Sequence, residues 1–418
     1  MTTELRINGK RLLERIDELA AIGPIEGGGS CRLALTDEDR DGRDLVVAWM
    51  KDLAMEVQID GIGNVVGIRS GVTDGAPTMT GSHIDTVRTG GRYDGNLGVL
   101  AGLEIVETLA ENNIETYHPL AVAFFTDEEG SRFAPDMLGS LVYVGGLNLE
   151  EALDIEGIDG SKVGQELDRI GYRGVSPCPG LVPRAFVELH IEQGPVLENQ
   201  GFTIGAVTGV QGISWTEYKI TGQSNHAGTT PMNLRHDAGY VAASIANYVR
   251  SLALSMGGQQ VATVGRLDLH PNLVNVVAGS AVITVDLRNT DLEKLFEAER
   301  CLETFIADLA KLEGVVVADR QLARFEPVQF TSRVIDTVIA VSDRLGHSVL
   351  KLPSGAGHDA QMLARVCPTG MIFVPSQDGI SHNPAEYTNP EDLVAGCNVL
   401  LQTILDLDKS ELNPEREQ

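Results

Sequence analysis

The 418-residue sequence has no apolar run of about 18 residues, the length that a membrane-spanning helix requires. Residues 1–20 are charged throughout and lack the apolar core of a signal peptide. Its five cysteines are scattered, without CxxC spacing, which is typical of reduced thiols rather than of a disulfide framework or a thiolate zinc site. We therefore expect a cytoplasmic protein that makes no contact with a membrane.

Positive charge is also scarce. Lysine and arginine number 32 against 59 acidic residues, so the formal net charge is -27. The electrostatic field of so negative a protein repels phosphate backbones and anionic lipid headgroups. Nucleic acid and membrane surfaces are therefore not expected as partners. Hydrophobic residues make up 43% of the chain, an ordinary globular composition, and the length indicates two domains.

The first half of the chain alternates helical and strand patterns. Apolar residues recur at helical spacing over 8–20, 44–55 and 97–110, and β-rich segments cover 64–68, 78–83 and the fully apolar 120–125. The alternation of helix and strand patterns returns after about Phe330, with a helix near 332–345 and a strand over 369–374. Alternating strands and helices predict a layered α/β domain with a mainly parallel sheet. The polar residues 411–418 are expected to fray.

A different order of elements interrupts this domain. Strand patterns cover 214–221, 261–269, 276–288 and 315–323, and helical patterns cover 237–254 and 292–312. The resulting β-α-β-β-α-β order is that of a ferredoxin-like split βαβ unit. We therefore predict a discontinuous α/β domain formed by residues 1–211 and 329–418, with an inserted α+β domain at 212–328.

Acidic residues and histidines gather beside glycines at the ends of the expected strands. The segments are residues 81–98, 125–133, 188–194 and 380–383. They contain His83, Asp85, Asp94, Glu128, Glu129, His190 and His382. Ligands of open α/β sheets bind at the carboxyl ends of strands, so we expect these side chains to form one site.

Metal binding explains this combination of side chains. Imidazoles and carboxylates without cysteine suit Zn, Mn, Co or Ni. Two such ions need a bridging carboxylate, and Asp94 lies in a glycine-rich turn suited to that role. His83 and His190 would complete one metal, and Glu129 and His382 the other. The sequence therefore predicts two divalent metal ions.

Two further acids suit supporting roles at such a centre. Asp85 follows His83 by two residues and is predicted to orient its imidazole. Glu128, beside the ligand Glu129, is placed to take a proton from the attacking water and to return it to the leaving nitrogen. The paired glutamates would thus divide into a ligand and a general base.

Long motifs in the chain resemble one family. Gly-Ser-His-Ile-Asp at 81–85, Gly-Arg-Tyr-Asp-Gly at 91–95 and Asp-Glu-Glu-Gly-Ser-Arg-Phe at 127–133 are joined by residues 188–195, 222–232 and 355–360. They resemble the N-carbamoyl-L-amino acid hydrolase, allantoate amidohydrolase and β-ureidopropionase branch of the M20 metallopeptidase-like amidohydrolases, also called the hydantoinase/carbamoylase family. The motif order is preserved over nearly the whole chain.

The resemblance implies an aminopeptidase-like catalytic domain with a mixed sheet and an insert that serves as lid and dimerisation domain. It implies the same ligands as above, with Asp94 shared between the two metals, and Glu128 as general acid/base. A homodimer formed through the lid is also implied. No position among these departs from the family pattern.

The resemblance further implies residues that bind the substrate. His226 would stabilise the oxyanion, in some members from across the dimer, Asn275 and Arg288 would bind the substrate carboxylate, and Gln193 would line the pocket. A guanidinium matches a carboxylate bidentately, which an anionic substrate requires in a very acidic protein. His226 lies in a glycine-rich loop, where backbone and imidazole donors can meet an oxyanion.

We therefore expect a hydrolase that cleaves a C–N bond of a small anionic ureido substrate, an N-carbamoyl-L-amino acid, allantoate or β-ureidopropionate. The motifs leave open which of these it is, the physiological metal, and the roles of His358 and Asp359. An aminopeptidase or deacylase of the same superfamily is the nearest alternative. A non-catalytic binding protein is a more distant one, whose expected mark, a lost ligand or base, is not found in the sequence.

Overall fold

The computed structural model describes residues 4–410, so the expected fraying of 411–418 lies outside the described residues. The chain divides into two compact units. Unit 1 comprises Met1–Gly209 and Gln329–Gln418, and unit 2 is Val210–Val328. Unit 2 covers the residues of the expected insert, and its role as a lid stays a prediction.

Unit 1 contains a nine-stranded mixed sheet in the order β1-β2-β4-β3-β5-β13-β6-β11, with β12 paired to β6. β3, β4, β5 and β13 run parallel at its centre, whereas β1 with β2, β2 with β4, and β6 with β13 are antiparallel. The strands are β1 Glu56–Ile59, β2 Val65–Arg69, β3 Thr78–His83, β4 Leu120–Phe125, β5 Ala185–Ile191, β6 Ile204–Val210, β11 Val328–Gln329, β12 Val349–Ser354 and β13 Thr369–Val374.

The four parallel strands are buried along their whole length. This is expected of central strands whose two faces are both covered. The predicted α/β class with a mixed sheet is confirmed, and the parallel pairing is confined to the centre of the sheet. The carboxyl ends of β3, β4 and β5 lie next to one another, because these strands are parallel neighbours.

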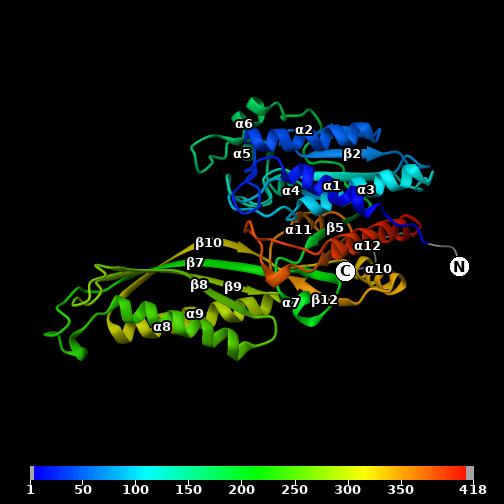
Figure 1. Ribbon diagram of the computed structural model, residues 1–418. Coiled ribbons are helices and arrows are strands. Elements are labelled where there is room, and N and C mark those ends of the chain that lie inside the picture. Colours follow the sequence, from blue (N-terminus) through cyan, green and yellow to red (C-terminus); the bar gives the residue numbers. More distant parts are fainter. Residues whose placement is uncertain (1–3, 411–418) are drawn as a thin grey trace. The chain divides into compact units, whose positions relative to one another are not determined.

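Helices pack on the strands of this sheet and on one another (Figure 1). α3 packs on β3 and β5, α12 on β13 and β5, and α1 on α3. The helices are α1 Gly9–Ala20, α2 Asp37–Asp52, α3 Asn96–Glu111, α4 Leu138–Tyr143, α5 Leu149–Leu153, α6 Val163–Ile170, α7 Val196–Gln200, α10 Ser332–Leu345, α11 Asp359–Leu363 and α12 Pro390–Asp408, with a 3-10 turn η2 at Gln377–Gly379.

One helix begins earlier than its apolar pattern predicts. α2 starts at Asp37 rather than at Asp44 because Thr36 caps it, accepting a hydrogen bond from the Asp39 N–H. Acidic side chains at Asp37, Glu38 and Asp39 occupy its first turn, where they interact favourably with the helix dipole.

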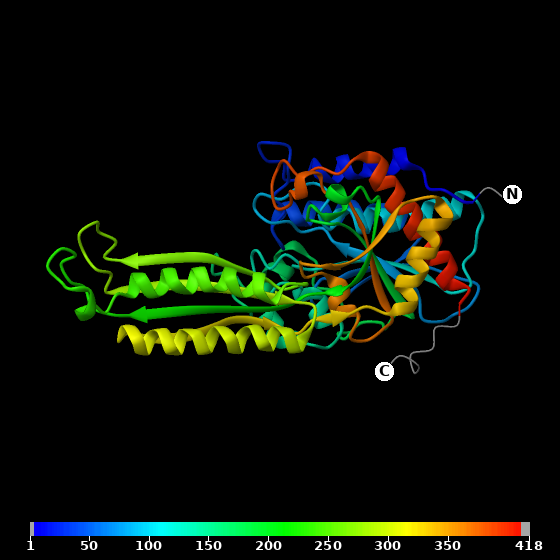
Figure 2. The ribbon, with the colours of Figure 1, turned by 90° about the horizontal axis from the view of Figure 1, so that it is seen from below.

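Unit 2 is a four-stranded antiparallel sheet in the order β10-β7-β9-β8, with α8 and α9 packed on one face (Figure 2). Its elements are β7 Gly212–Thr221, η1 Met232–Leu234, α8 Ala238–Met256, β8 Val261–His270, β9 Ser280–Asn289, α9 Leu292–Glu313 and β10 Val316–Phe325. Their order is the predicted β-α-β-β-α-β. Asp237 and Asp291 cap the two helices, each by accepting hydrogen bonds from two backbone N–H groups of the first turn.

Burial alternates residue by residue along β9. Ile283, Val285 and Leu287 face the helices and belong to the apolar core of unit 2. The intervening residues, including Asp286 and Arg288, lie on the opposite face, as expected of an antiparallel sheet covered on one side. None of the helices within residues 4–410 combines the length and apolar character that crossing a membrane requires.

Candidate active site

His83 is the last residue of β3. Its Nδ1 lies 3.0 Å from the main-chain carbonyl oxygen of Asp85, so this nitrogen carries the proton and Nε2 presents a lone pair. The Asp85 carboxylate was predicted to orient this ring, but its Oδ1 lies 3.9 Å from Nδ1. Its oxygens instead accept hydrogen bonds from the N–H groups of Glu128 (3.2 Å) and Glu129 (3.3 Å). The Asp85 carboxylate therefore holds the loop of the two glutamates, and its carbonyl orients His83.

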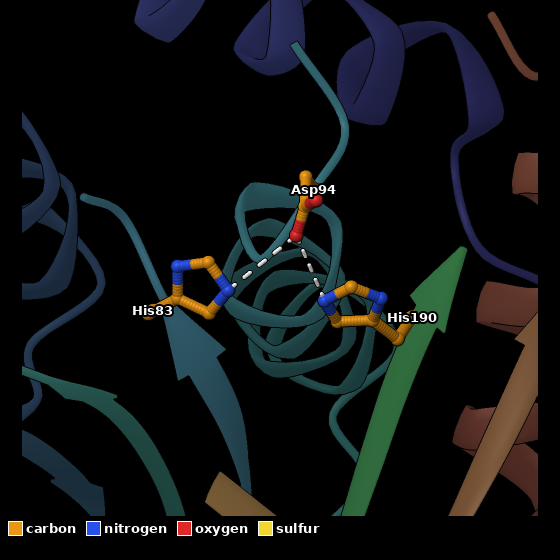
Figure 3. A group of neighbouring side chains, drawn as sticks. All are labelled: His83, Asp94 and His190. Atoms are coloured by element: carbon orange, nitrogen blue, oxygen red, sulfur yellow. Dashed lines mark ion pairs between the residues drawn. The ribbon is translucent and has the colours of Figure 1, made fainter. Parts of the chain in front are cut away.

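His190 reaches the same point from β5. Its Nδ1 lies 2.9 Å from the carbonyl oxygen of Ile191, which again leaves Nε2 as the acceptor nitrogen. The Nε2 atoms of His190 and His83 lie 3.2 Å and 3.6 Å from Asp94 Oδ1, and the three side chains converge from two strands and a loop (Figure 3). All three side chains are buried. They form a ready set of three ligands.

Asp94 is held in place from several sides. Its Oδ2 accepts hydrogen bonds from Gln193 Nε2 (2.8 Å) and Ser381 Oγ (3.0 Å). The next residue, Gly95, has a φ of 67°, and a Cβ there would lie 2.4 Å from the His83 ring. Only glycine fits this position, because both the backbone conformation and the close ring exclude a side chain. The carboxylate is thereby fixed between the histidines.

A second group of ligands uses the other oxygen of Asp94. His382 Nε2 lies 3.5 Å from Asp94 Oδ2 and 3.2 Å from Glu129 Oε2. Donors bound to one metal at about 2.0–2.2 Å in tetrahedral geometry lie roughly 3.3–3.6 Å apart. The separations of the two histidines from Asp94 Oδ1, and of His382 from Asp94 Oδ2 and Glu129, are 3.2–3.6 Å and match this spacing, and all donors of each group lie within 4.8 Å of one another. The residues present therefore fit two divalent ions that share Asp94.

The carboxylates favour positive charge at the imidazole nitrogens. Burial lowers the pKa of His83, but the carboxylates of Glu128, Asp94 and Asp85 together raise it by more than burial lowers it. The resulting pKa is well above the ordinary value of a histidine. The hydrogen bond to Glu129 raises the pKa of His382 to about 9. A proton or a metal ion can supply the charge that this environment stabilises.

Glu128 lies beside the first ligand group without being part of it. Its Oε2 is 3.3 Å from His83 Nε2, and 7% of the residue is exposed. Burial, together with neighbouring carboxylates, raises its pKa well above the ordinary value of a glutamate. A carboxyl group with a raised pKa can both take up and release a proton near neutral pH.

Gln193 contacts the candidate ligand Asp94 directly, and the pocket-lining role that the family resemblance implied stays a prediction. Its Nε2 donates to Asp94, while its Oε1 is buried and accepts no hydrogen bond from the described residues. A buried carbonyl oxygen without a donor is costly, so it is suited to a ligand that carries an N–H group. The positive φ of 56° at Gln193 turns its side chain after β5 ends.

His358 and Asp359, which the sequence left unassigned, lie buried behind the first ligand group. The His358 ring packs edge-on against His190 with centroids 4.6 Å apart, and its Nε2 lies 2.9 Å from Ser354 Oγ. Glu188, also buried, accepts hydrogen bonds from Ser82 Oγ (2.6 Å) and the Ala360 N–H (2.9 Å). Burial raises the pKa of Asp359 to about 8. These groups form a polar layer that supports His190.

Glu386 and Ser381 also contact the site, and sequence reasoning missed them. Glu386 is 5% exposed and accepts hydrogen bonds from the N–H groups of Tyr93 (3.0 Å) and Asp94 (3.3 Å). Ser381 Oγ lies 3.2 Å from Glu386 Oε2 as well as 3.0 Å from Asp94 Oδ2. No local pattern could reveal contacts between residues 293 positions apart in the chain.

Arg288 lies near the end of β9, on the face of the unit 2 sheet that the helices leave uncovered. Asp286 accepts from its Nε (3.1 Å) and Nη2 (2.9 Å), and its guanidinium lies 5.7 Å from the centroid of the Trp215 ring. The ion pair and the aromatic contact together orient the guanidinium.

His226 and Asn275 lie near each other beyond the opposite end of β9. The Ala227 N–H donates to the Asn275 carbonyl (2.9 Å), and His226 forms a β-bridge with Val276. Asn275 therefore lies beyond Ser280, the first residue of β9. Arg288 lies eight positions after Ser280 along this continuous strand, a span of about 26 Å. The predicted joint binding of one carboxylate by Asn275 and Arg288 is therefore not possible within one chain.

Comparisons with known proteins give close matches over nearly the whole chain. The pattern of peptidase family M20/M25/M40 matches residues 79–406. The N-carbamoyl-L-amino-acid amidohydrolase of Rhizobium meliloti is 40% identical over 402 residues, covering 96% of this chain and 97% of the relative. The ureidoglycolate hydrolase of Arabidopsis thaliana is 32% identical, over 97% of this chain and 88% of the relative. A hydantoinase/carbamoylase family amidase from Burkholderia multivorans has a TM-score of 0.94 and 46% identity, over 96% of this chain and 98% of that one.

Proposed function

Because this chain belongs to peptidase family M20/M25/M40, we propose that it is a metal-dependent amidohydrolase that hydrolyses a C–N bond of an N-carbamoyl-L-amino acid. It is a hydrolase of C–N bonds other than peptide bonds, as its curated relatives are. The single observation that carries the proposal is the pair of ligand groups that share Asp94, with Glu128 beside them.

The chain's own residues suit two divalent ions. His83, Asp94 and His190 would hold one, and Asp94, Glu129 and His382 the other. When bound, such ions polarise a carbonyl group and lower the pKa of water. The nitrogen and oxygen donors, without sulfur, suit Zn, Mn, Co or Ni.

Glu128 moves the proton in this proposal. Its carboxylate takes a proton from the water that adds to the ureido carbonyl carbon, and then delivers this proton to the amino-acid nitrogen as the C–N bond breaks. The released carbamic acid decomposes to CO2 and ammonia. The buried position of Glu128, 3.3 Å from His83, supports this role. Gln193 Oε1 is a suitable acceptor for a ureido N–H group.

The substrate carboxylate is assigned to Arg288, whose guanidinium is oriented by Asp286 and Trp215. His226 is assigned to the developing oxyanion. The Gly228 N–H donates to His226 Nδ1 at 3.1 Å, so the neutral imidazole carries its proton on Nε2 and can donate it to an oxygen. This hydrogen-bonding pattern supports the role that the family resemblance implies.

The two ends of β9 lie roughly 26 Å apart, so residues at both ends can contact one small substrate only if two chains contribute them. This points to a homodimer. We propose that Arg288 serves the site of its own chain, while His226 and Asn275 of the partner subunit complete it. The loops that carry these two residues expose large apolar side chains, as expected of a surface that another chain covers. These are Met232, Leu234, Leu273 and Val274, exposed by 76%, 63%, 59% and 104%.

A second candidate substrate is ureidoglycolate, because relatives in Arabidopsis and rice are named for it. Its ureido group and carboxylate offer the same two handles. We also propose that the enzyme is cytoplasmic, because its five cysteines are dispersed as reduced thiols are.

Ammonia release tests the proposal. Protein stripped of metal and reloaded with Mn, Zn, Co or Ni is incubated with N-carbamoyl-L-amino acids, allantoate, β-ureidopropionate and ureidoglycolate. Metal-dependent release from an N-carbamoyl-L-amino acid supports the proposal, whereas release from ureidoglycolate alone would transfer the assignment to that substrate. No release from any of them, together with cleavage of peptides or acyl amino acids, would overturn it.

A further inference from the structure

Glu386 connects two loops that carry metal ligands. It lies four residues after His382, and its side chain reaches the loop that ends in Asp94. One oxygen, Oε1, accepts hydrogen bonds from two consecutive N–H groups of that loop, those of Tyr93 and Asp94. The other oxygen, Oε2, lies 3.2 Å from the hydroxyl of Ser381. A single buried carboxylate therefore contacts both segments.

Ser381 extends this connection to the ligand side chain. Ser381 directly precedes His382 in the chain, and its Oγ lies 3.0 Å from Asp94 Oδ2. Asp94 is thus positioned twice from the same segment, at its main chain by Glu386 and at its carboxylate by Ser381. A further hydrogen bond, from Thr89 Oγ1 to the His382 carbonyl at 3.1 Å, joins the two loops at another point.

The packing around Glu386 leaves no space for another side chain. A Cβ added at Gly91 would lie 2.0 Å from Glu386 Oε1 and 2.1 Å from its Cδ. This is far inside van der Waals contact, so the loop can close on the carboxylate only with glycine at this position. Gly91, the first glycine of the Gly-Arg-Tyr-Asp-Gly motif, is therefore required for a steric reason that the motif itself does not reveal.

We propose that Glu386 is a positioning residue of the metal centre, which fixes the main chain of Asp94 so that its carboxylate can bridge two ions. The inference rests on the proposed function, because it assumes that Asp94 binds metal. Partners that hold metal ligands in place commonly change metal affinity by roughly 10- to 100-fold when they are removed.

The test measures metal affinity, by competition with a chromophoric chelator, on full-length protein that has been stripped and titrated with Zn or Mn. E386A removes both acceptors, so we expect its affinity to fall by roughly 10- to 100-fold. E386Q retains an oxygen that can accept the same N–H groups, and should stay within about threefold of wild type. A purely space-filling role predicts instead that E386M, which keeps the volume of the side chain but has no oxygen acceptor, binds metal as tightly as wild type, whereas the proposal predicts a loss like that of E386A.

Glu104 provides the matched control. It is also buried in unit 1, within α3, and accepts hydrogen bonds from the Asn8 N–H (2.8 Å), Arg11 Nε (2.7 Å) and Thr108 Oγ1 (2.9 Å), partners that lie at α1 and within α3 rather than in the loops that carry metal ligands. E104A should lower the thermal stability of the stripped protein and leave metal affinity within about threefold of wild type. Equal losses of affinity in E104A and E386A would overturn the proposal, since the effect would then be one of general stability.

G91A gives an independent variant that retains Glu386. Its methyl group displaces the carboxylate, so we expect metal affinity to fall as in E386A. G75A is its control, because a Cβ there would lie no closer than 3.6 Å to any neighbour. Wild-type affinity in both E386A and G91A would overturn the inference. A wild-type protein that binds no metal at all would instead overturn the proposed function, and the inference with it.

Discussion

Arg288 and Asn275 lie at opposite ends of strand β9, on either side of a continuous eight-residue span. Because each residue of a strand advances about 3.3 Å, no small substrate can reach both of them in one chain. The Ala227–Asn275 hydrogen bond fixes His226 at the same end as Asn275. The two predicted binding groups therefore cannot serve the same site within one chain, and in the proposed dimer they would serve different sites.

Subunit mixing tests this arrangement. E128Q and H226A chains are co-expressed with different tags, and the heterodimer is purified on both tags. One of its two sites would combine an intact Glu128 with an intact His226 of the partner subunit, so about half of the wild-type activity should return. Each variant alone should be nearly inactive. If His226 acted within its own chain, neither site of the heterodimer would be complete and no activity would return.

Replacing Glu128 by glutamine should separate catalysis from metal binding. The amide cannot carry the proton from water to the leaving nitrogen, so kcat should fall by roughly 10²- to 10⁴-fold. Both metals should remain, since Glu128 belongs to neither ligand group. Elemental analysis after dialysis measures the metal content, with E129Q as a control that should lose metal. Activity above about a tenth of wild type would exclude Glu128 as the base.

The Arg288 assignment predicts an effect that depends on the substrate. R288A should lower kcat/KM for an N-carbamoyl-L-amino acid by roughly 10- to 100-fold, chiefly through KM, because a charge-assisted hydrogen-bonded pair is lost. A carbamoyl amine without the carboxylate should be hydrolysed equally well by both proteins. R266A, a change on the neighbouring strand β8, is the control and should resemble wild type. An equal loss on both substrates would show that Arg288 acts in some other way.

Much of the candidate metal site could be predicted from the sequence, because its proposed ligands lie at or after the ends of neighbouring parallel strands. His83 ends β3 and His190 lies near the end of β5, so strand patterns alone bring them together. The separation of Asn275 from Arg288 was also readable, since the sequence predicted a strand over 276–288. The length of that strand already excludes, within one chain, the shared role that the family resemblance implies.

Other features depend on contacts that the sequence does not encode locally. The hydrogen bond from the Asp94 N–H to Glu386 joins residues 292 positions apart. That the carbonyl of Asp85, and not its carboxylate, orients His83 depends on how the chain turns after β3. The strands β6 and β12 lie at the antiparallel side of the sheet and were not predicted. They pair with distant segments, and no local pattern identifies these pairings.

Asp60 provides a test of stability against pH that is independent of the metal site. It lies between β1 and β2 in unit 1, 4% exposed, and its oxygens accept hydrogen bonds from the Ile62 N–H and from the Asn64 N–H and side chain. Burial outweighs these bonds and raises its pKa from 3.8 to about 6. The folded protein therefore binds this proton more tightly than the unfolded chain does.

The sign of the pH dependence follows from that shift. The contribution of Asp60 to stability is fully present below pH 3.8, the ordinary pKa of the group, and is lost as pH rises through about 6. In total it amounts to about 3 kcal/mol, of which roughly half falls between pH 5 and pH 7. The non-titrating variant D60N should lack this term. Relative to D60N, the wild type should therefore lose stability as the pH is raised.

Urea unfolding at several pH values measures this difference. The chain has two tryptophans, and in a W215F background Trp49, in α2 of unit 1, is the only one left to report. Metal is removed beforehand, so that ligand binding does not add its own pH dependence. The free energy of unfolding of W215F minus that of W215F/D60N should fall by about 1–2 kcal/mol from pH 5 to pH 7. A difference that stays constant or rises over this range would show that the folded state does not raise the pKa of Asp60.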